Sequence, residues 1–148
     1  SPSRGLGDVY KRQPLDTDLG VLLLRLFFGG MFAYYGWAKI ENYDVILPQF
    51  GDIIGIGPKL SFNLVIFGEF VCGILIALGL FTRLSVIPSF ITMVVAFFIA
   101  HGKDEFANKI PAFTYLILSV IIFINGSGRY SVDALLFRKK IQQHNEEA

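Results

Sequence analysis

The sequence predicts an all-α fold, an integral membrane four-helix bundle with four transmembrane helices. Hydrophobic residues make up 53% of the 148 residues and charged residues only 17%, whereas about 25% of residues are charged in a typical soluble domain. Four long segments are also almost free of charge, and a helix needs about 20 mostly apolar residues to cross a bilayer. The expected spans are Leu19–Ala38, Leu60–Phe81, Leu84–Ala100 and Ile110–Asn125.

The four spans differ in the charges that they contain. The first is interrupted only by Arg25 and the second only by Glu69, and the third contains no charge. The fourth is the shortest, and it is long enough if its helix begins near Asn108. A soluble bundle would show polar faces at a period of about 3.6 residues, but "SVIPSFITMVVAFFIA" and "FTYLILSVIIFI" show none. A membrane bundle is therefore favoured over a soluble one.

Three regions are expected along the chain. Residues 1–13, "SPSRGLGDVYKRQ", are polar and lack periodicity, and they resemble translated sequencing-adaptor read-through. We therefore expect them to be a disordered, non-native leader. Residues 14–137 are expected to form the four-helix domain, and residues 138–148 a polar cytoplasmic tail.

The loop charges predict the orientation in the membrane, because cytoplasmic loops carry an excess of Lys and Arg. With four spans, both termini lie on the same side as the turn between the second and third spans. That side carries Arg83, Arg129, Arg138, Lys139 and Lys140, against Lys39, Lys59, Lys103 and Lys109 on the other side. We expect both termini to be cytoplasmic.

Glu69 is the most unusual residue of the spans. It lies nine residues past Leu60, so about 13 Å below the outer surface at about 1.5 Å per residue. An isolated acid at this depth costs at least about 2.5 kcal/mol, so Glu69 should face the bundle and have a partner or be protonated. Lys39 is the first candidate, and Tyr35 and His101 lie toward the same side. This candidate polar cluster is either a structural device that fixes helix packing or a ligand or proton site.

Arg25 is also a candidate binding residue of the bundle, although it lies near the opposite side of the membrane. It is six residues past Leu19, so about 9 Å above the cytoplasmic surface. Its expected partners are the carbonyl groups at the end of the second span, or Asp133. A direct pair with Glu69 is less favoured, because about 8–10 Å of depth separates the two side chains.

The glycines inside the first two spans are expected to serve packing, since small residues let membrane helices approach closely. They are Gly29, Gly30, Gly36, Gly68, Gly73 and Gly79.

Several kinds of chemistry are excluded by the residues themselves. The chain has one cysteine, Cys72, so an intrachain disulfide, a CxxC pair and a Cys-rich metal site are impossible. Of the two histidines, His144 lies in the polar tail, which excludes haem ligation by a pair of intramembrane histidines. No nucleotide-binding motif or nucleophile elbow is present, and no basic run with interleaved aromatics indicates nucleic-acid binding. We expect no metal and no intrinsic cofactor, so any redox chemistry must involve a partner or a bound quinone.

Four features, in order, resemble the signatures of the DoxX family of small bacterial membrane proteins. They are "RLFFGGMFAYYGWAKI", "GEFVCGILIALGLFTR", His101 and "GSGRYSVD". The resemblance covers Leu19–Asp133. Two departures stand out: Tyr35 precedes Gly36 where the family often has a histidine, and Ser127 replaces a proline of the last motif.

The resemblance implies a four-helix protein of the bacterial inner membrane. Relatives in this family include a subunit of thiosulfate:quinone oxidoreductase and proteins of membrane oxidoreductase complexes that respond to oxidative stress. The absence of the histidine before Gly36 puts in doubt any proton transfer assigned to that position, although Tyr35 can still donate a hydrogen bond.

Three functions are compatible with these observations. The first is a membrane subunit of a quinone-linked oxidoreductase, in which Glu69, Lys39 and His101 surround a quinone headgroup and soluble or membrane oxidoreductase subunits are the partners. The second is a small proton-coupled transporter that uses Glu69 and acts as a homodimer. The third is a non-catalytic assembly protein, in which the charges only specify packing.

Overall fold

The structure is a computed structural model that describes residues 17–147, so the predicted leader at residues 1–13 lies outside the described part. Helices are the only regular elements within that range. In chain order they are α2 (Thr17–Glu41), α3 (Tyr43–Ile46), the 3₁₀ turn η1 (Leu47–Gln49), α4 (Pro58–Ile66), the π-helical turn η2 (Phe67–Val71), α5 (Cys72–Leu78), α6 (Thr82–Val95), the π-helical turn η3 (Ala96–Ala100), α7 (Phe106–Asn125) and α8 (Val132–Glu147).

The predicted all-α membrane bundle is confirmed. Four continuous helical stretches are long and apolar enough to cross a membrane: Thr17–Glu41, Pro58–Leu78, Thr82–Ala100 and Phe106–Asn125. The second is built from α4, η2 and α5, and the third from α6 and η3. Many large apolar side chains on these helices are exposed, Leu23 at 59% and Phe27 at 55% among them, as suits a surface that faces lipid.

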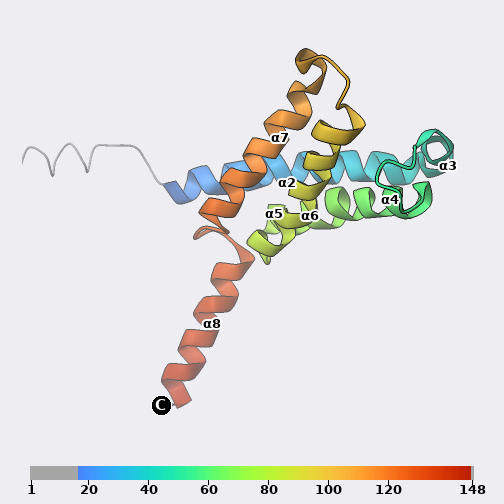
Figure 1. Cartoon of the computed structure of the whole chain (residues 1–148). Coiled ribbons are helices and arrows are strands. Elements are labelled where there is room, and N and C mark those ends of the chain that lie inside the picture. The colour runs from blue at the N-terminus through green and yellow to red at the C-terminus, as the bar shows by residue number, and fades with distance from the viewer. Residues whose placement is uncertain (1–16, 148) are drawn as a thin grey trace, which may run out of the picture.

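The four spans are arranged as two antiparallel pairs (Figure 1). In the first pair α2 packs along α4, η2 and α5, and in the second α6 packs along α7. The pairs are joined by contacts of α6 with α5 and of α2 with α7. Toward α3 and toward the loop between η3 and α7 the two pairs point in different directions, and α8 leaves the bundle at the opposite end (Figure 1). We call the end at which the pairs diverge, toward α3 and the loop between η3 and α7, the Lys39 end. We call the opposite end, from which α8 leaves, the α8 end.

The second span ends three residues earlier than the sequence predicts, at Leu78 instead of Phe81, because a glycine terminates it. Gly79 adopts a left-handed conformation with φ 75° directly after the last residue of α5. The Leu80 N–H then donates to the Leu75 carbonyl at 2.9 Å, and the Gly79 N–H donates to Ile76 at 3.1 Å, the pattern that closes helices with a glycine. The turn 79–81 therefore separates α5 from α6.

Close helix packing at the first pair depends on glycine. A Cβ at Gly29 would lie 2.6 Å from the Ala77 nitrogen, and one at Gly73 would lie 2.8 Å from the Ala33 nitrogen. The core beside this contact is aromatic, with the Phe28 and Phe32 rings stacked at 4.3 Å. These contacts fix the depth of α2 relative to η2, and so they position the site described next.

The boundary predicted at residue 138 falls inside a helix. α8 runs from Val132 to Glu147 without interruption, so the polar tail continues the segment that follows the fourth span.

Candidate functional site at the Lys39–Glu69 ion pair

Lys39 and Glu69 form an ion pair inside the bundle, with 2.7 Å between Lys39 Nζ and Glu69 Oε2. Glu69 is the more buried partner: its side chain is 8% exposed, against 26% for Lys39. Because Lys39 belongs to the last turn of α2, its ammonium group reaches inward from the Lys39 end. The pair is thus shielded on the side of the carboxylate and accessible on the side of the amine.

The backbone around Glu69 is widened into a π-helical turn. Glu69 is the central residue of η2, and such turns occur frequently at functional sites. The π turn interrupts the α-helical register between α4 and α5, which changes the direction in which Glu69 points. Nothing in the sequence indicated this turn.

A glycine on α2 brings Lys39 close enough to make the pair. A Cβ at Gly36 would lie 2.6 Å from the backbone nitrogen of Phe70, so only glycine lets α2 approach η2 to this distance. Lys39 follows Gly36 by three residues and therefore lies on the same side of α2. One face of α2 therefore makes both contacts: Gly36 allows the close approach to η2, and Lys39 forms the ion pair.

Two tyrosines extend the polar cluster. The Lys39 ammonium lies 6.0 Å from the centre of the Tyr35 ring, within reach of a cation–π attraction. The Tyr35 ring in turn meets Tyr115 of α7 edge-on, with 6.4 Å between the ring centres. Tyr115 was not among the residues predicted for the cluster from the sequence, although it is the only tyrosine of the fourth span.

His101 does not join this cluster, contrary to the expectation from the sequence. Its Nδ1 lies 2.8 Å from Asp104 Oδ2, and both side chains are about half exposed. Among residues 17–147, no hydrogen bond or ion pair connects His101 with Lys39 or Glu69. The expectation used depth alone, but the two helix pairs diverge toward this end (Figure 1), so equal depth does not bring the residues together.

Arg25 lies at the other end of the bundle, as expected from its depth. Its Nη1 donates to the carbonyl oxygens of Ala77 at 3.2 Å and Ile76 at 3.4 Å, and its Nη2 donates to the Tyr130 carbonyl. The side chain is only 1% exposed. Its positive charge therefore caps the carbonyl end of α5, where the helix dipole is negative, and the expectation of carbonyl partners is confirmed.

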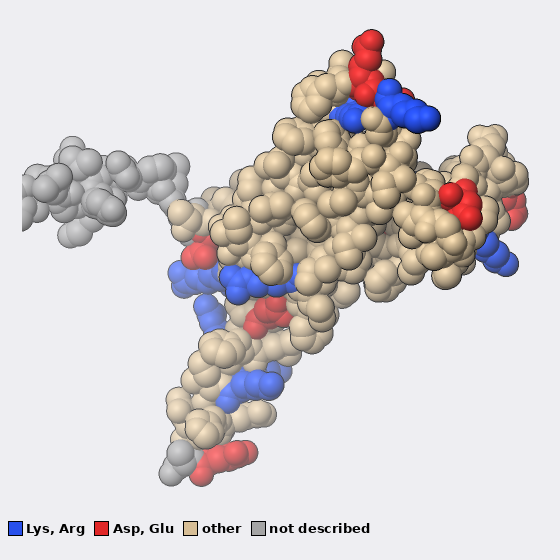
Figure 2. Space-filling model, in the orientation of Figure 1, with Lys and Arg blue, Asp and Glu red and all other residues tan. Residues whose placement is uncertain are grey.

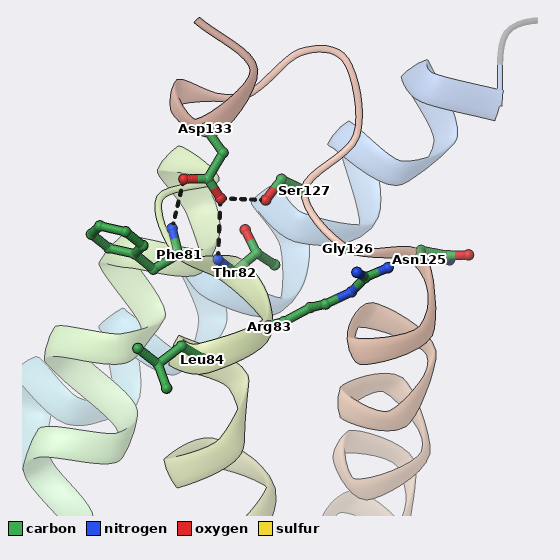
Figure 3. A pocket seen from close by; sticks show the side chains of 8 residues that line it. All are labelled: Phe81, Thr82, Arg83, Leu84, Asn125, Gly126, Ser127 and Asp133. Carbon is green, nitrogen blue, oxygen red and sulfur yellow. Dashed lines mark hydrogen bonds between the residues drawn. The ribbon is translucent and has the colours of Figure 1, made fainter. Parts of the chain in front are cut away.

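Asp133 completes the structure of the α8 end (Figure 3). Its carboxylate accepts hydrogen bonds from the backbone N–H groups of Phe81 at 2.9 Å and Thr82 at 3.4 Å and from the Ser127 hydroxyl at 2.6 Å. Burial alone would raise the pKa of Asp133, but these three hydrogen bonds and the charge of Arg25 outweigh it and hold the pKa below its usual value. Asp133 thereby caps the first turn of α6 from a different helix.

A pocket of about 400 Å³ lies beside this carboxylate (Figure 3). Arg83, on its wall, donates from Nε to the Phe123 carbonyl at 3.0 Å and from Nη2 to the Ile124 carbonyl at 3.2 Å. The charged groups that face the pocket thus make their hydrogen bonds to the chain itself. This pocket therefore lies at a junction of α6, α7 and α8, and its charged side chains are already paired within the chain.

The chemistry available at the pair is that of a proton donor and acceptor. An ammonium group has three N–H donors, and Lys39 uses one of them on Glu69. Among the described residues, no group of three or more His, Cys, Asp and Glu side chains could hold a metal ion. The pair can bind a polar group and exchange protons with it.

Residues 20–102 match the family model described as DoxX. This match covers more than half of the chain. The chain belongs to the DoxX family. It is 32% identical over 126 residues to "Inner membrane protein YqjF" of Escherichia coli K12, which covers 82% of this chain and 95% of that protein. It is 28% identical over 125 residues to "Putative oxidoreductase CatD" of Bacillus subtilis 168, which covers 83% and 91%. No solved structure matches it.

The motif residues of this DoxX protein form two separate clusters. Lys39 and Glu69 form the ion pair at the Lys39 end, and Arg25 and Asp133 tie α5, α6 and α8 together at the α8 end. The protein is a multi-pass membrane protein, in agreement with its four spans and with the printed name of the Escherichia coli relative.

Proposed function

We propose that this DoxX protein is the membrane subunit of a quinone-linked oxidoreductase, with the Lys39–Glu69 pair as the site that holds the quinone headgroup. The observation that carries the proposal is the ion pair itself: a lysine and a glutamate 2.7 Å apart inside an apolar bundle, with Lys39 partly exposed. The relative named as an oxidoreductase favours this chemistry over other uses of a buried ion pair.

Lys39 would hold the headgroup through a carbonyl oxygen. Two of its three N–H donors remain after the bond to Glu69 Oε2, and an ammonium donor makes a stronger hydrogen bond than a neutral one. The Tyr35 ring lies beside the ammonium group, and the Tyr115 ring packs against Tyr35, so the two rings supply an aromatic wall. The residues present therefore fit a flat, apolar molecule with carbonyl groups.

Glu69 would supply and accept protons at its carboxylate. It is 6% exposed, so water does not compete freely for its oxygens, and the π-helical turn holds it opposite Lys39. A bound quinone supplies the two-electron chemistry that this chain lacks. The electrons would come from an oxidoreductase subunit outside this chain.

Solvent extraction of the detergent-purified protein, followed by mass spectrometry for quinones, tests the proposal. We expect close to one quinone per chain in the wild type and its loss in Glu69→Gln, which removes the charge and keeps the shape. Glu41→Gln is the matched control, because Glu41 is an exposed carboxylate at the end of α2, the helix that carries Lys39. It should retain the quinone.

Two results would contradict the proposal. One is a folded wild-type protein without quinone, and the other is equal retention in wild type and Glu69→Gln. In either case, proton flux in liposomes that depends on Glu69 would identify a carrier, and the absence of flux would leave an assembly role.

A further inference from the structure

Cations gather where α8 leaves the bundle (Figure 2). The cluster consists of Arg83, Arg129, Arg138, Lys139 and Lys140. Two carboxylates, Asp18 and Asp133, belong to the same end, and both oxygens of Asp133 accept hydrogen bonds from Phe81, Thr82 and Ser127. Positive charge therefore predominates at this end of the bundle.

Lys139 and Lys140, like Arg138 beside them, have no partner in the described part of the chain. Within residues 17–147, neither makes a hydrogen bond, an ion pair or a ring contact. The first cation of the group, Arg83, is occupied by two carbonyl groups of α7. The two lysines are thus free to bind an anion from outside the chain.

The polarity of α8 changes along its axis rather than across it. After the first three residues of α8 come Leu135, Leu136 and Phe137, at 63%, 48% and 66% exposed. Arg138, Lys139 and Lys140 follow directly. At about 100° per residue, three consecutive positions cover more than half of the helix circumference. Residues 135–137 therefore surround much of α8 with apolar side chains, and residues 138–140 surround it with basic ones. Apolar followed by basic is also the order of acyl chains and headgroups at a membrane surface.

A hollow of about 820 Å³ lies between α8 and the turn that precedes α6. Its apolar part contains Phe81, which is 60% exposed, together with Leu136 and Phe137. Its polar lining contains Lys139, Lys140 and Gln143, together with Ser127 and Asp133, which are hydrogen-bonded to each other. We call this space the α8 hollow.

We propose that the α8 hollow binds an anionic phospholipid. Lys139 and Lys140 pair with the phosphate headgroup, and the first part of an acyl chain lies against Phe81 and Phe137. Two observations favour lipid over an acidic partner protein. The apolar part adjoins the ends of spans two and three, which are apolar enough to cross a bilayer, and the cations follow the apolar residues directly along α8. The proposal is independent of the quinone chemistry at the Lys39 end.

Native mass spectrometry of the full chain in detergent tests the site, with phosphatidylglycerol and phosphatidylcholine as the added lipids. Compared with the wild type, Lys139→Gln/Lys140→Gln should bind phosphatidylglycerol about 10- to 30-fold more weakly, because each lysine contributes roughly fivefold in affinity. Its affinity for phosphatidylcholine should equal that of the wild type. The matched control is Lys59→Gln/Lys103→Gln, which removes two exposed lysines at the opposite end. It should change phosphatidylglycerol binding less than twofold.

A second variant tests the apolar part. Phe137→Ala keeps both lysines and should weaken the binding of both lipids, because the acyl chain loses its contact. Three results would overturn the proposal: unchanged phosphatidylglycerol affinity in the lysine variant, an equal loss in the control, or an equal loss for phosphatidylcholine. A dimer that the lysine variant dissociates, with unchanged lipid binding, would also overturn it and assign the hollow to a second copy of the chain.

Discussion

The guanidinium group of Arg25 donates to the backbone carbonyl of Tyr130, although 105 positions separate the two residues in the chain. The same group donates to the carbonyl oxygens at the end of α5. One buried side chain of α2 therefore joins the second span to the segment that leads into α8. It explains how the α8 end is held together without an ion pair between Arg25 and a carboxylate in the described part of the chain.

Arg25→Met should destabilise the protein strongly. The apolar side chain fits the volume but leaves the carbonyl groups of Ala77 and Tyr130 without a donor, and a buried polar group without a partner costs about 1–3 kcal/mol. We expect the free energy of unfolding in detergent to fall by at least about 2 kcal/mol. Arg138→Met, at a residue without a partner in the described range, should change it by less than about 0.5 kcal/mol. Equal stability of the two variants would contradict the role given to Arg25.

Asp133 should make stability depend on acidic pH. Its folded-state pKa lies below the usual value, so its stabilising contribution is complete above about pH 4, the usual range of an aspartate. The contribution is lost as the pH falls through the folded-state pKa. Unfolding measured between about pH 7 and pH 3 should therefore show the wild type losing its advantage over Asp133→Asn at low pH. A constant difference across this range would mean that Asp133 does not titrate with folding.

Gly29 and Gly30 should respond oppositely to the same substitution. A Cβ at Gly29 would lie 2.6 Å from the Ala77 nitrogen and 2.9 Å from the Ala77 Cβ, whereas a Cβ at Gly30 meets nothing within 4 Å. Gly29→Ala should lower the free energy of unfolding by about 1–3 kcal/mol through overpacking. Gly30→Ala should be neutral or stabilising by up to about 1 kcal/mol. Thermal unfolding of the two purified variants checks this pair, and similar effects would contradict the close contact of α2 with α5.

These two glycines show what the sequence could and could not predict. The spans followed from their length and lack of charge, and packing was predicted for the glycines as a class. Neighbouring positions on a helix point about 100° apart, and the sequence alone does not give the rotation of α2 about its axis. Gly30 was therefore grouped with Gly29, although only Gly29 lies at the helix contact.

The candidate site was also predicted only in part, because the sequence gives the depth of a residue along its span but not its lateral position. The depth of Glu69 along its span identified Lys39 as its partner, because both residues lie toward one end. Depth alone, however, also predicted His101 in the cluster. The helix pairs diverge toward this end, so His101 lies apart from the ion pair and contacts Asp104 instead. The π-helical turn at Glu69 has no residue signature, so it could not be predicted from the sequence.

The Lys39–Glu69 pair should show strong coupling in a double-mutant cycle. Lys39→Met alone leaves the Glu69 carboxylate inside the bundle without its partner, which costs about 3 kcal/mol for a charge within a membrane. Glu69→Gln together with Lys39→Met removes both charges, so the free energy of unfolding should recover most of that loss. Unfolding of the wild type, both single variants and the double variant in detergent measures the coupling energy.

The same double variant separates a structural role from a functional one. His101→Gln is the control, since His101 pairs with Asp104 away from the site, and it should retain any quinone bound by the wild type. If the double variant is folded but has lost the quinone while His101→Gln keeps it, the charges act on the ligand and not only on the packing of α2 against η2. Retention of quinone by the double variant would mean that the pair serves only helix packing, because the quinone would then bind without either charge.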